Sequence, residues 1–139
     1  MAVKTYSGSC HCGAGRFQAD IDLREGTNRC NCSICTKARA WFVFVKADRL
    51  RMISGSEAMA DYQWAPPGKP HPHLHYHFCR TCGVRLFARG NQEALGGAFY
   101  AVAVASLDDA DADELAASIK YVDGRNDRYD RAPQDTRLM

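Results

Sequence analysis

The cysteines of this chain constrain its fold more than any other feature. Three of them fall within six residues, at Cys30, Cys32 and Cys35. Residues i and i+2 of a strand face the same side, and a helical or turn-like step brings residue i+5 round to them. The three sulfurs therefore converge on one point about 2.3 Å from each, which is the geometry of a zinc site. Such a site is closed when the protein supplies a fourth ligand and open when water or a substrate does.

The other four cysteines form two separated pairs, Cys10/Cys12 and Cys79/Cys82. A glycine directly follows each pair, and an arginine and a phenylalanine come shortly after it. Glycine lets the backbone turn with positive φ and direct N–H groups at the thiolates. We interpret the two pairs as matching halves of one closed site. Seven cysteines then divide into four and three, which predicts two zinc ions per chain, one structural and one open.

A framework of disulfides is the alternative interpretation of clustered cysteines. The cysteine count is odd, and residues 1–6 contain no apolar signal segment. No stretch is apolar for long enough to span a bilayer, and a net charge of +2 is too small to indicate a nucleic acid or an anionic membrane surface. We therefore expect a cytoplasmic protein with reduced cysteines, no nucleic-acid partner and no membrane attachment. The sequence leaves the oligomeric state open.

The pattern of apolar and β-branched residues predicts a mainly-β fold with little helix. A chain of 139 residues is long enough for one domain. We expect a zinc-binding domain over residues 1–122 and an irregular C-terminal tail over 123–139 that belongs to it. Acidic residues indicate the start of a short helix within 108–117, and loops are expected at 22–28 and 66–72. The expected strands are residues 3–9, 16–21, 41–45, 51–53, 59–64, 73–78, 85–89, 98–104 and 119–122.

Three histidines alternate with hydrophobic residues over residues 73–78. In a strand, His73, His75 and His77 share one face. One interpretation is a half-exposed strand whose imidazoles meet solvent. The other is that one of them, His77 first of all, supplies the fourth ligand of the Cys30/Cys32/Cys35 zinc or moves a proton. His11 is a further candidate for closing that site.

The open site favours one kind of chemistry. Three thiolates on Zn²⁺ leave a net charge of about −1, so the ion is a weaker Lewis acid than one held by histidines. A substrate thiolate suits it as fourth ligand, which favours making or breaking a carbon–sulfur bond at a small thiol. Arg29, Lys37 and Arg39 flank the cluster, and Arg80 lies within the last cysteine pair. Each of these cations is ordinary surface charge by itself, but together they are candidates for attracting an anionic thiol.

The residues around the cysteines resemble a known family, the glutathione-dependent formaldehyde-activating enzymes, to which the centromere-protein-V-like proteins also belong. The resemblance covers roughly residues 4–105, and the ending Tyr121-Val122-Asp123-Gly124-Arg125 is similar to one of its subgroups. The matching segments are Ser9-Cys10-His11-Cys12-Gly13, Cys30-Asn31-Cys32-Ser33-Ile34-Cys35-Thr36-Lys37, Ser54-Gly55 and Phe78-Cys79-Arg80-Thr81-Cys82-Gly83.

This resemblance implies a β-tent fold of small antiparallel sheets around the zinc sites. The implied activity is that of a zinc-dependent carbon–sulfur lyase, which joins formaldehyde to glutathione as S-hydroxymethylglutathione or reverses that step. A small glutathione-like thiol is then the substrate. The alternative is a non-enzymatic zinc module that binds a protein or another partner; an open second site favours the enzyme, and a closed one favours the module. The implied ligands are Cys10, Cys12, Cys79 and Cys82 for structural zinc, and Cys30, Cys32 and Cys35 for catalytic zinc.

Overall fold

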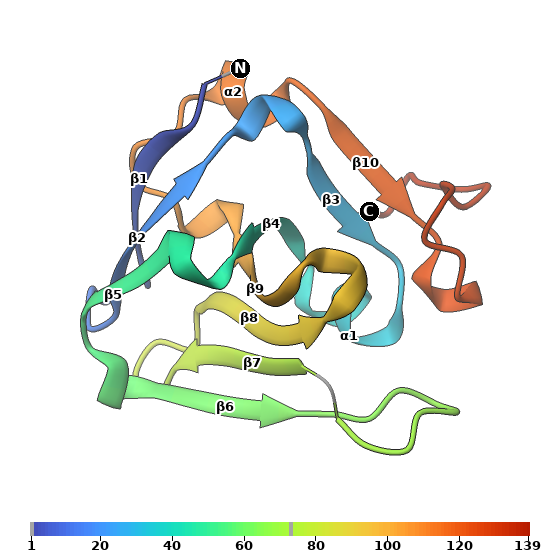
Figure 1. Ribbon diagram of the computed structural model, residues 1–139, viewed down its shortest axis with the longest axis horizontal. Coiled ribbons are helices and arrows are strands. Elements are labelled where there is room, and N and C mark those ends of the chain that lie inside the picture. The colour runs from blue at the N-terminus through green and yellow to red at the C-terminus, as the bar shows by residue number, and fades with distance from the viewer. Residues whose placement is uncertain (1, 73) are drawn as a thin grey trace.

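Two β-sheets and two short α-helices make up the computed structural model, which describes residues 2–72 and 74–139 (Figure 1). The smaller sheet has the strand order β1-β2-β5, and the larger has the order β10-β3-β4-β9-β8-β7-β6. This arrangement confirms the predicted mainly-β fold class. The strands are β1 Lys4–Ser9, β2 Arg16–Ile21, β3 Thr27–Cys30, β4 Trp41–Lys46, β5 Leu50–Ser54, β6 Met59–Gln63, β7 Leu74–Cys79, β8 Arg85–Gln92, β9 Gly97–Ala103 and β10 Ile119–Val122.

The expected strands are all present, and the segment that differs from expectation is residues 22–28. Instead of a loop, this segment contains a 3-10 helix, Leu23–Glu25, and the first residues of β3. Its polar residues give no alternating pattern, but β3 pairs with β4 on one side and β10 on the other. Thr27 is buried there and accepts a hydrogen bond of 2.7 Å from Trp41 Nε1. Residues 27–30 therefore form a strand because both edges of the segment pair with neighbouring strands, although the sequence lacks an alternating pattern.

The pair formed by β3 and β10 is parallel, whereas the other paired strands are antiparallel. An arrangement of antiparallel sheets alone was expected. The long connection over residues 104–118 carries the chain back to the start of β3, so β10 runs in the same direction as β3. The register places Val122 opposite Cys30. The chain therefore leaves β10 directly beside the second group of cysteines.

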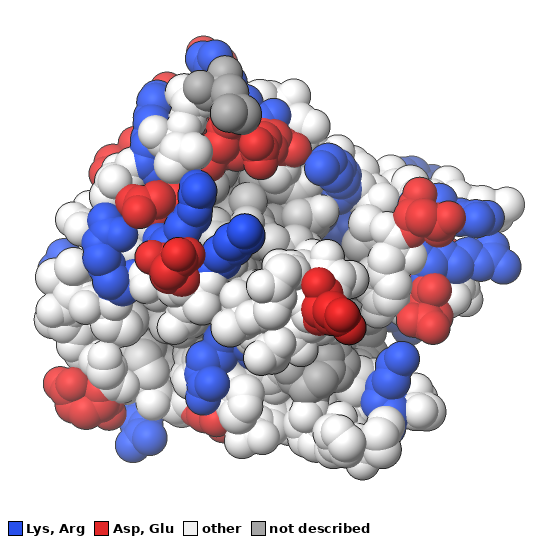
Figure 2. Space-filling view, viewed as in Figure 1, with Lys and Arg blue, Asp and Glu red and all other residues white. Residues whose placement is uncertain are grey.

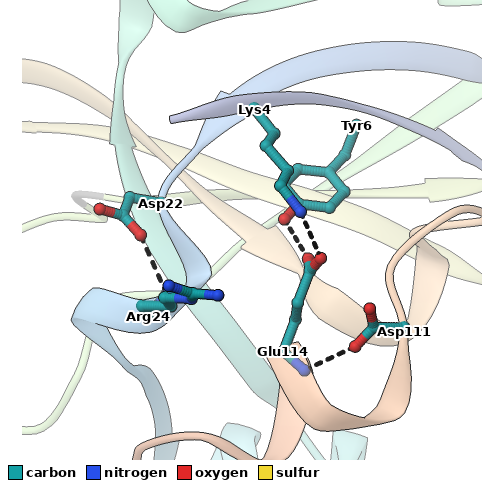
Figure 3. A network of polar contacts seen from close by, with 6 residues as sticks. All are labelled: Lys4, Tyr6, Asp22, Arg24, Asp111 and Glu114. Atoms are coloured by element: carbon teal, nitrogen blue, oxygen red, sulfur yellow. Dashed lines mark hydrogen bonds and ion pairs between the residues drawn. The ribbon is translucent and has the colours of Figure 1, made fainter. Parts of the chain in front are cut away.

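The helix expected within residues 108–117 is α2, Ala112–Ala116. Asp111 caps it by accepting a hydrogen bond of 2.8 Å from the Glu114 N–H. Glu114 in turn accepts hydrogen bonds from the Tyr6 hydroxyl and, at 2.6 Å, from Lys4 Nζ (Figure 3). These contacts attach α2 to β1 at the edge of the smaller sheet.

The core lies between the two sheets, where aromatic rings from each sheet meet. The rings of Phe17 on β2 and Phe87 on β8 pack edge to face, with centroids 5.9 Å apart. Phe17 and Leu86 are 1% and 0% exposed, and burial of each such side chain contributes about 1.5–3 kcal/mol. A Cβ on Gly8 would lie 2.3 Å from the Phe17 ring, so glycine allows β1 to pass close to the core.

Charged side chains of both signs are interspersed over the surface seen in Figure 2. Ion pairs join Arg51 to Asp20 at 3.2 Å and Arg131 to Asp130 at 3.2 Å. The described part of the chain contains no helix with the length and apolar character that crossing a membrane requires.

Candidate metal centres

The structure brings together Cys10, Cys12, Cys79 and Cys82, here called the four-cysteine cluster, with their sulfurs all within 4.8 Å of one another. The Sγ atoms of Cys10 and Cys12 are 3.7 Å apart, and those of Cys12 and Cys79 are 3.6 Å apart. Sulfurs at the corners of a tetrahedron with metal–sulfur bonds of about 2.3 Å would be separated by about 3.8 Å. These thiols are free rather than joined in disulfides. The donor set and its spacing therefore fit a tetrahedral zinc ion.

The two cysteine pairs of this cluster are built alike, although they lie far apart in the sequence. The N–H of Cys10 donates to the Gly15 carbonyl at 3.1 Å, and the N–H of Cys79 donates to the Val84 carbonyl at 3.0 Å. Each pair thus sits in a turn closed by a hydrogen bond to the residue five positions further on. The two cysteine pairs therefore have matching backbone hydrogen bonds, as expected for two halves of one site.

The glycines after the cysteine pairs adopt positive φ, 80° at Gly13 and 77° at Gly83, as expected. Their own N–H groups donate to backbone carbonyls and not to thiols. The donors to the buried sulfurs are the N–H groups of Gly15, at 3.3 Å, and Thr81, at 3.4 Å. The glycines therefore shape the turns, and neighbouring residues provide the N–H donors that stabilise thiolates.

Backbone N–H groups also favour the thiolate of Cys82. Hydrogen bonds from the N–H groups of Cys12 and Val84 lower the pKa of Cys82 to about 6. Metals bind the thiolate form of cysteine, so this environment prepares the group as a ligand.

The second group, here called the three-cysteine cluster, consists of Cys30, Cys32 and Cys35. Cys30 ends β3, Cys32 is the N-cap of α1 (Ser33–Ala38), and Cys35 lies within α1. A strand followed by a helical step therefore brings the sulfurs within 4.8 Å of one another. In the residues that the structure describes, no His, Asp, Glu or further Cys ligand atom joins this group. The donor set fits a zinc ion with three protein ligands and one position left for another ligand.

The thiol of Cys32 lies where several donors converge. Hydrogen bonds from the Cys30 and Cys35 thiols, and then from the backbone N–H groups of Cys35 and Ile34, lower the pKa of Cys32. Cys32 and Cys35 are both partly exposed, whereas Cys10 and Cys79 of the four-cysteine cluster are buried. Cys30 is buried as well, and Cys12 of the four-cysteine cluster is exposed, so burial alone does not distinguish the two clusters. The distinction lies in the number of ligands, because the three-cysteine cluster leaves one position of a tetrahedral ion to a ligand from solution.

The described histidines of β7 contact other side chains and belong to neither cysteine cluster. Nε2 of His77 accepts a hydrogen bond of 3.0 Å from Arg89, and Nδ1 of His75 lies 2.8 Å from a carboxylate oxygen of Asp61. The two imidazoles share one face of the strand, as the alternation predicts, and are stacked with centroids 6.4 Å apart. Burial lowers the pKa of His77. His73 lies outside the described residues.

A pocket beside the three-cysteine cluster contains two of the basic residues expected near it. Arg29 and Arg39 line it together with Cys30 and Cys35. The guanidinium of Arg29 lies 4.7 Å from the centroid of the Trp41 ring. The structure does not bring all the flanking cations to this pocket: Lys37 is exposed on α1, and Arg80 is exposed beside the four-cysteine cluster.

The C-terminal segment, residues 123–139, contacts the loop that carries the three-cysteine cluster and lies next to β3 and β10 in Figure 1. The buried carboxylate of Asp123 accepts a hydrogen bond of 2.9 Å from Asn31, the residue between Cys30 and Cys32. The N–H of Arg125 donates to Oδ1 of Asn31, also at 2.9 Å. The sequence analysis expects an irregular tail here and misses these contacts; the Asp-Gly-Arg sequence at the start of the segment was the available signal.

Gly124→Ala is expected to weaken metal binding at the three-cysteine cluster about tenfold or more, because partners of metal ligands have effects of that size. A Cβ at this position would lie 2.4 Å from the Sγ of Cys30. Competition with a chromogenic chelator measures the affinity. Gly68→Ala is the control for general backbone strain, because Gly68 has a φ of 80° but a Cβ there meets nothing within 4 Å. Equal metal affinity in both variants would contradict the expectation.

Comparison with known proteins agrees with this geometry. The chain is 36% identical over 85 residues to a protein of Halomonas elongata that is provisionally named a glutathione-dependent formaldehyde-activating enzyme; the match covers 58% of this chain and 53% of that protein. The chain thus matches about half the length of that relative. A crystal structure of a Rhodobacter sphaeroides protein superposes with a TM-score of 0.65 at 26% identity, over 81% of this chain and 97% of the other. The model of the family described as "Glutathione-dependent formaldehyde-activating enzyme" matches residues 5–122, and the chain belongs to that family.

Proposed function

We propose that this chain is a zinc-dependent carbon–sulfur lyase that makes or breaks a thiol–aldehyde adduct such as S-hydroxymethylglutathione. The observation that carries the proposal is the three-cysteine cluster, which has three thiol donors and adjoins a pocket lined by Arg29 and Arg39. When bound there by Cys30, Cys32 and Cys35, a zinc ion supplies a position that favours the thiolate form of a substrate thiol at neutral pH.

The arginines of the pocket provide the orientation that the addition needs. Glutathione has two carboxylates, and Arg29 and Arg39 offer guanidinium groups for binding them. Held in this way, the thiol sulfur forms a bond to the carbonyl carbon of formaldehyde, and the thiol proton ends on the aldehyde oxygen. The reverse step breaks the same bond and returns the thiol and the aldehyde. Fixing the reacting atoms next to each other lowers the barrier mainly through orientation.

The same proposal covers the organisation and location of the protein. We propose that residues 1–122 form the zinc-binding domain and that residues 123–139 belong to it, since Asp123 and Arg125 hydrogen-bond to Asn31. The four-cysteine cluster then has a structural role. Seven free thiols suit a reducing compartment, which supports a cytoplasmic location.

The test compares wild type with Cys32→Ser by exchange NMR of formaldehyde and glutathione at equal protein concentration. Wild type is expected to accelerate exchange above the uncatalysed background, and Cys32→Ser is expected to lose that acceleration. Ser33→Ala, at the exposed neighbouring position, is the matched control and should behave as wild type. Binding of glutathione without acceleration would indicate another thiol adduct as substrate. Absence of thiol binding would favour the non-enzymatic zinc module.

A further inference from the structure

Cys30, the cysteine of the three-cysteine cluster that belongs to a strand, lies on one particular face of the larger sheet. Paired residues of neighbouring strands share a face, and so do alternate residues along a strand. Starting from Cys30, these two rules connect β3 with β7 across the sheet. The residues that share the face are Cys30, Asn28, Phe42, Phe44, Ala101, Ala88 and Tyr76. Tyr76 is buried on this face, and after burial itself, Cys35 and Cys32 are the next influences that raise its pKa.

A β-bulge turns Arg85 onto the same face. By simple alternation, Arg85 would lie with Phe87 on the opposite side, toward the core. The register of β7 and β8 shifts here, so that Phe87 pairs with His77 but Arg85 pairs with Phe78. Leu86 is the extra residue, and the guanidinium of Arg85 lies 4.6 Å from the centroid of the Tyr76 ring. Bulges often redirect a side chain next to a functional site.

The charge of Arg85 is not balanced by a carboxylate. Its side chain is half-buried, and it forms no ion pair with an acidic residue of the described part of the chain. Burial lowers the pKa of Arg85, while Cys35 and Cys32 are among the groups that act in the opposite direction. Taking a cation out of water is unfavourable unless an anion lies close to it. No carboxylate of the described residues supplies that anion. Arg85, on the sheet face that Cys30 shares, is therefore available to an anion that binds at the three-cysteine cluster.

We propose that Arg85 is a specificity-determining residue that binds a carboxylate of the thiol substrate at the three-cysteine cluster. This inference rests on the proposed function, which it deepens. A guanidinium fixed on an aromatic ring presents its planar N–H groups to a carboxylate in a preorganised way. Together with Arg29 and Arg39 of the pocket, Arg85 selects a thiol with separated carboxylates, such as glutathione, over a neutral thiol.

Calorimetric titration of the zinc-loaded protein tests the proposal with two thiols, glutathione and the uncharged 2-mercaptoethanol. Arg85→Gln is expected to weaken glutathione binding about tenfold or more, as loss of hydrogen bonds between charged groups does. Binding of 2-mercaptoethanol is expected to stay unchanged. Arg89→Gln is the matched control, because Arg89 lies on the same strand but is exposed and bonded to His77. This control should keep wild-type affinity for both thiols.

Equal weakening of both thiols in Arg85→Gln would overturn the inference, because Arg85 would then act on the cluster and not on the substrate. Unchanged glutathione binding would overturn it as well. If wild type binds neither thiol, the proposed function fails and this inference fails with it. Should Arg85→Gln not hold two zinc ions, Arg85→Lys decides by the same comparison of thiols, since it keeps the charge but loses the planar donors.

Discussion

Cys82→Ser is expected to leave the chain largely unfolded at room temperature. Cys82 belongs to the four-cysteine cluster, which joins two distant segments of the chain, since Cys12 and Cys79 are 67 positions apart in the sequence. A structural zinc contributes on the order of 10 kcal/mol or more to small metal-dependent domains, and the whole stability of a domain is about 5–15 kcal/mol. Cys82 is partly exposed, so its replacement by serine leaves no cavity in the core. Far-ultraviolet circular dichroism and denaturant titration measure the effect.

Cys32→Ser is the matched control for this prediction. It removes a thiol from the three-cysteine cluster, and the four-cysteine cluster still connects the segment after β1 to the turn between β7 and β8. We therefore expect this variant to fold. If Cys32→Ser and Cys82→Ser unfold at the same denaturant concentration, the two clusters do not differ in structural importance.

Much of the metal-binding arrangement could be predicted from the sequence because it depends on local geometry. The spacing of Cys30, Cys32 and Cys35 determines where their sulfurs point once a strand meets a helical step. Gly13 and Gly83 mark turns with positive φ, and such turns have few alternatives. Most strands were predictable for the same reason, since alternation of apolar and polar residues depends on near neighbours.

The features that escaped prediction depend on contacts between distant segments. Arg85 lies in a strand whose alternation directs it to the core, and only the bulge opposite His77 and Phe78 turns it toward Tyr76. A bulge depends on the partner strand, so one strand's sequence does not reveal it. The parallel pairing of β10 with β3 is likewise a property of the assembled sheet.

The basic residues that flank the three-cysteine cluster also could not be placed from the sequence alone. Arg29, Lys37 and Arg39 all lie close to the cluster in sequence, yet Arg29 and Arg39 line its pocket and Lys37 does not. Arg39 adopts positive φ, 53°, where α1 ends, and its Nη1 donates to the Leu138 carbonyl at 2.7 Å. Which cation faces a site therefore depends on how the helix ends and on what packs against it.

Chelation is expected to remove two zinc ions per chain in two separate steps. The three-cysteine cluster has three thiol donors and leaves one position to a ligand from solution, so it should lose its ion first and the fold should remain. The four-cysteine cluster holds its ion with four thiols from segments far apart in the sequence, and its ion should leave only as the chain unfolds.

A zinc-sensitive dye and circular dichroism, recorded together during titration with a strong chelator, follow both steps. Elemental analysis of protein purified without added metal gives the starting content, which is expected to be two zinc ions per chain. Cys32→Ser should show the later step alone, because its first site is already lost. Release of both ions in one step that coincides with unfolding would contradict this assignment, as would a starting content of one zinc or none with seven thiols free to react. The two-step result would instead mean that the fold depends on the four-cysteine cluster, while the three-cysteine cluster exchanges its ligands without disturbing it.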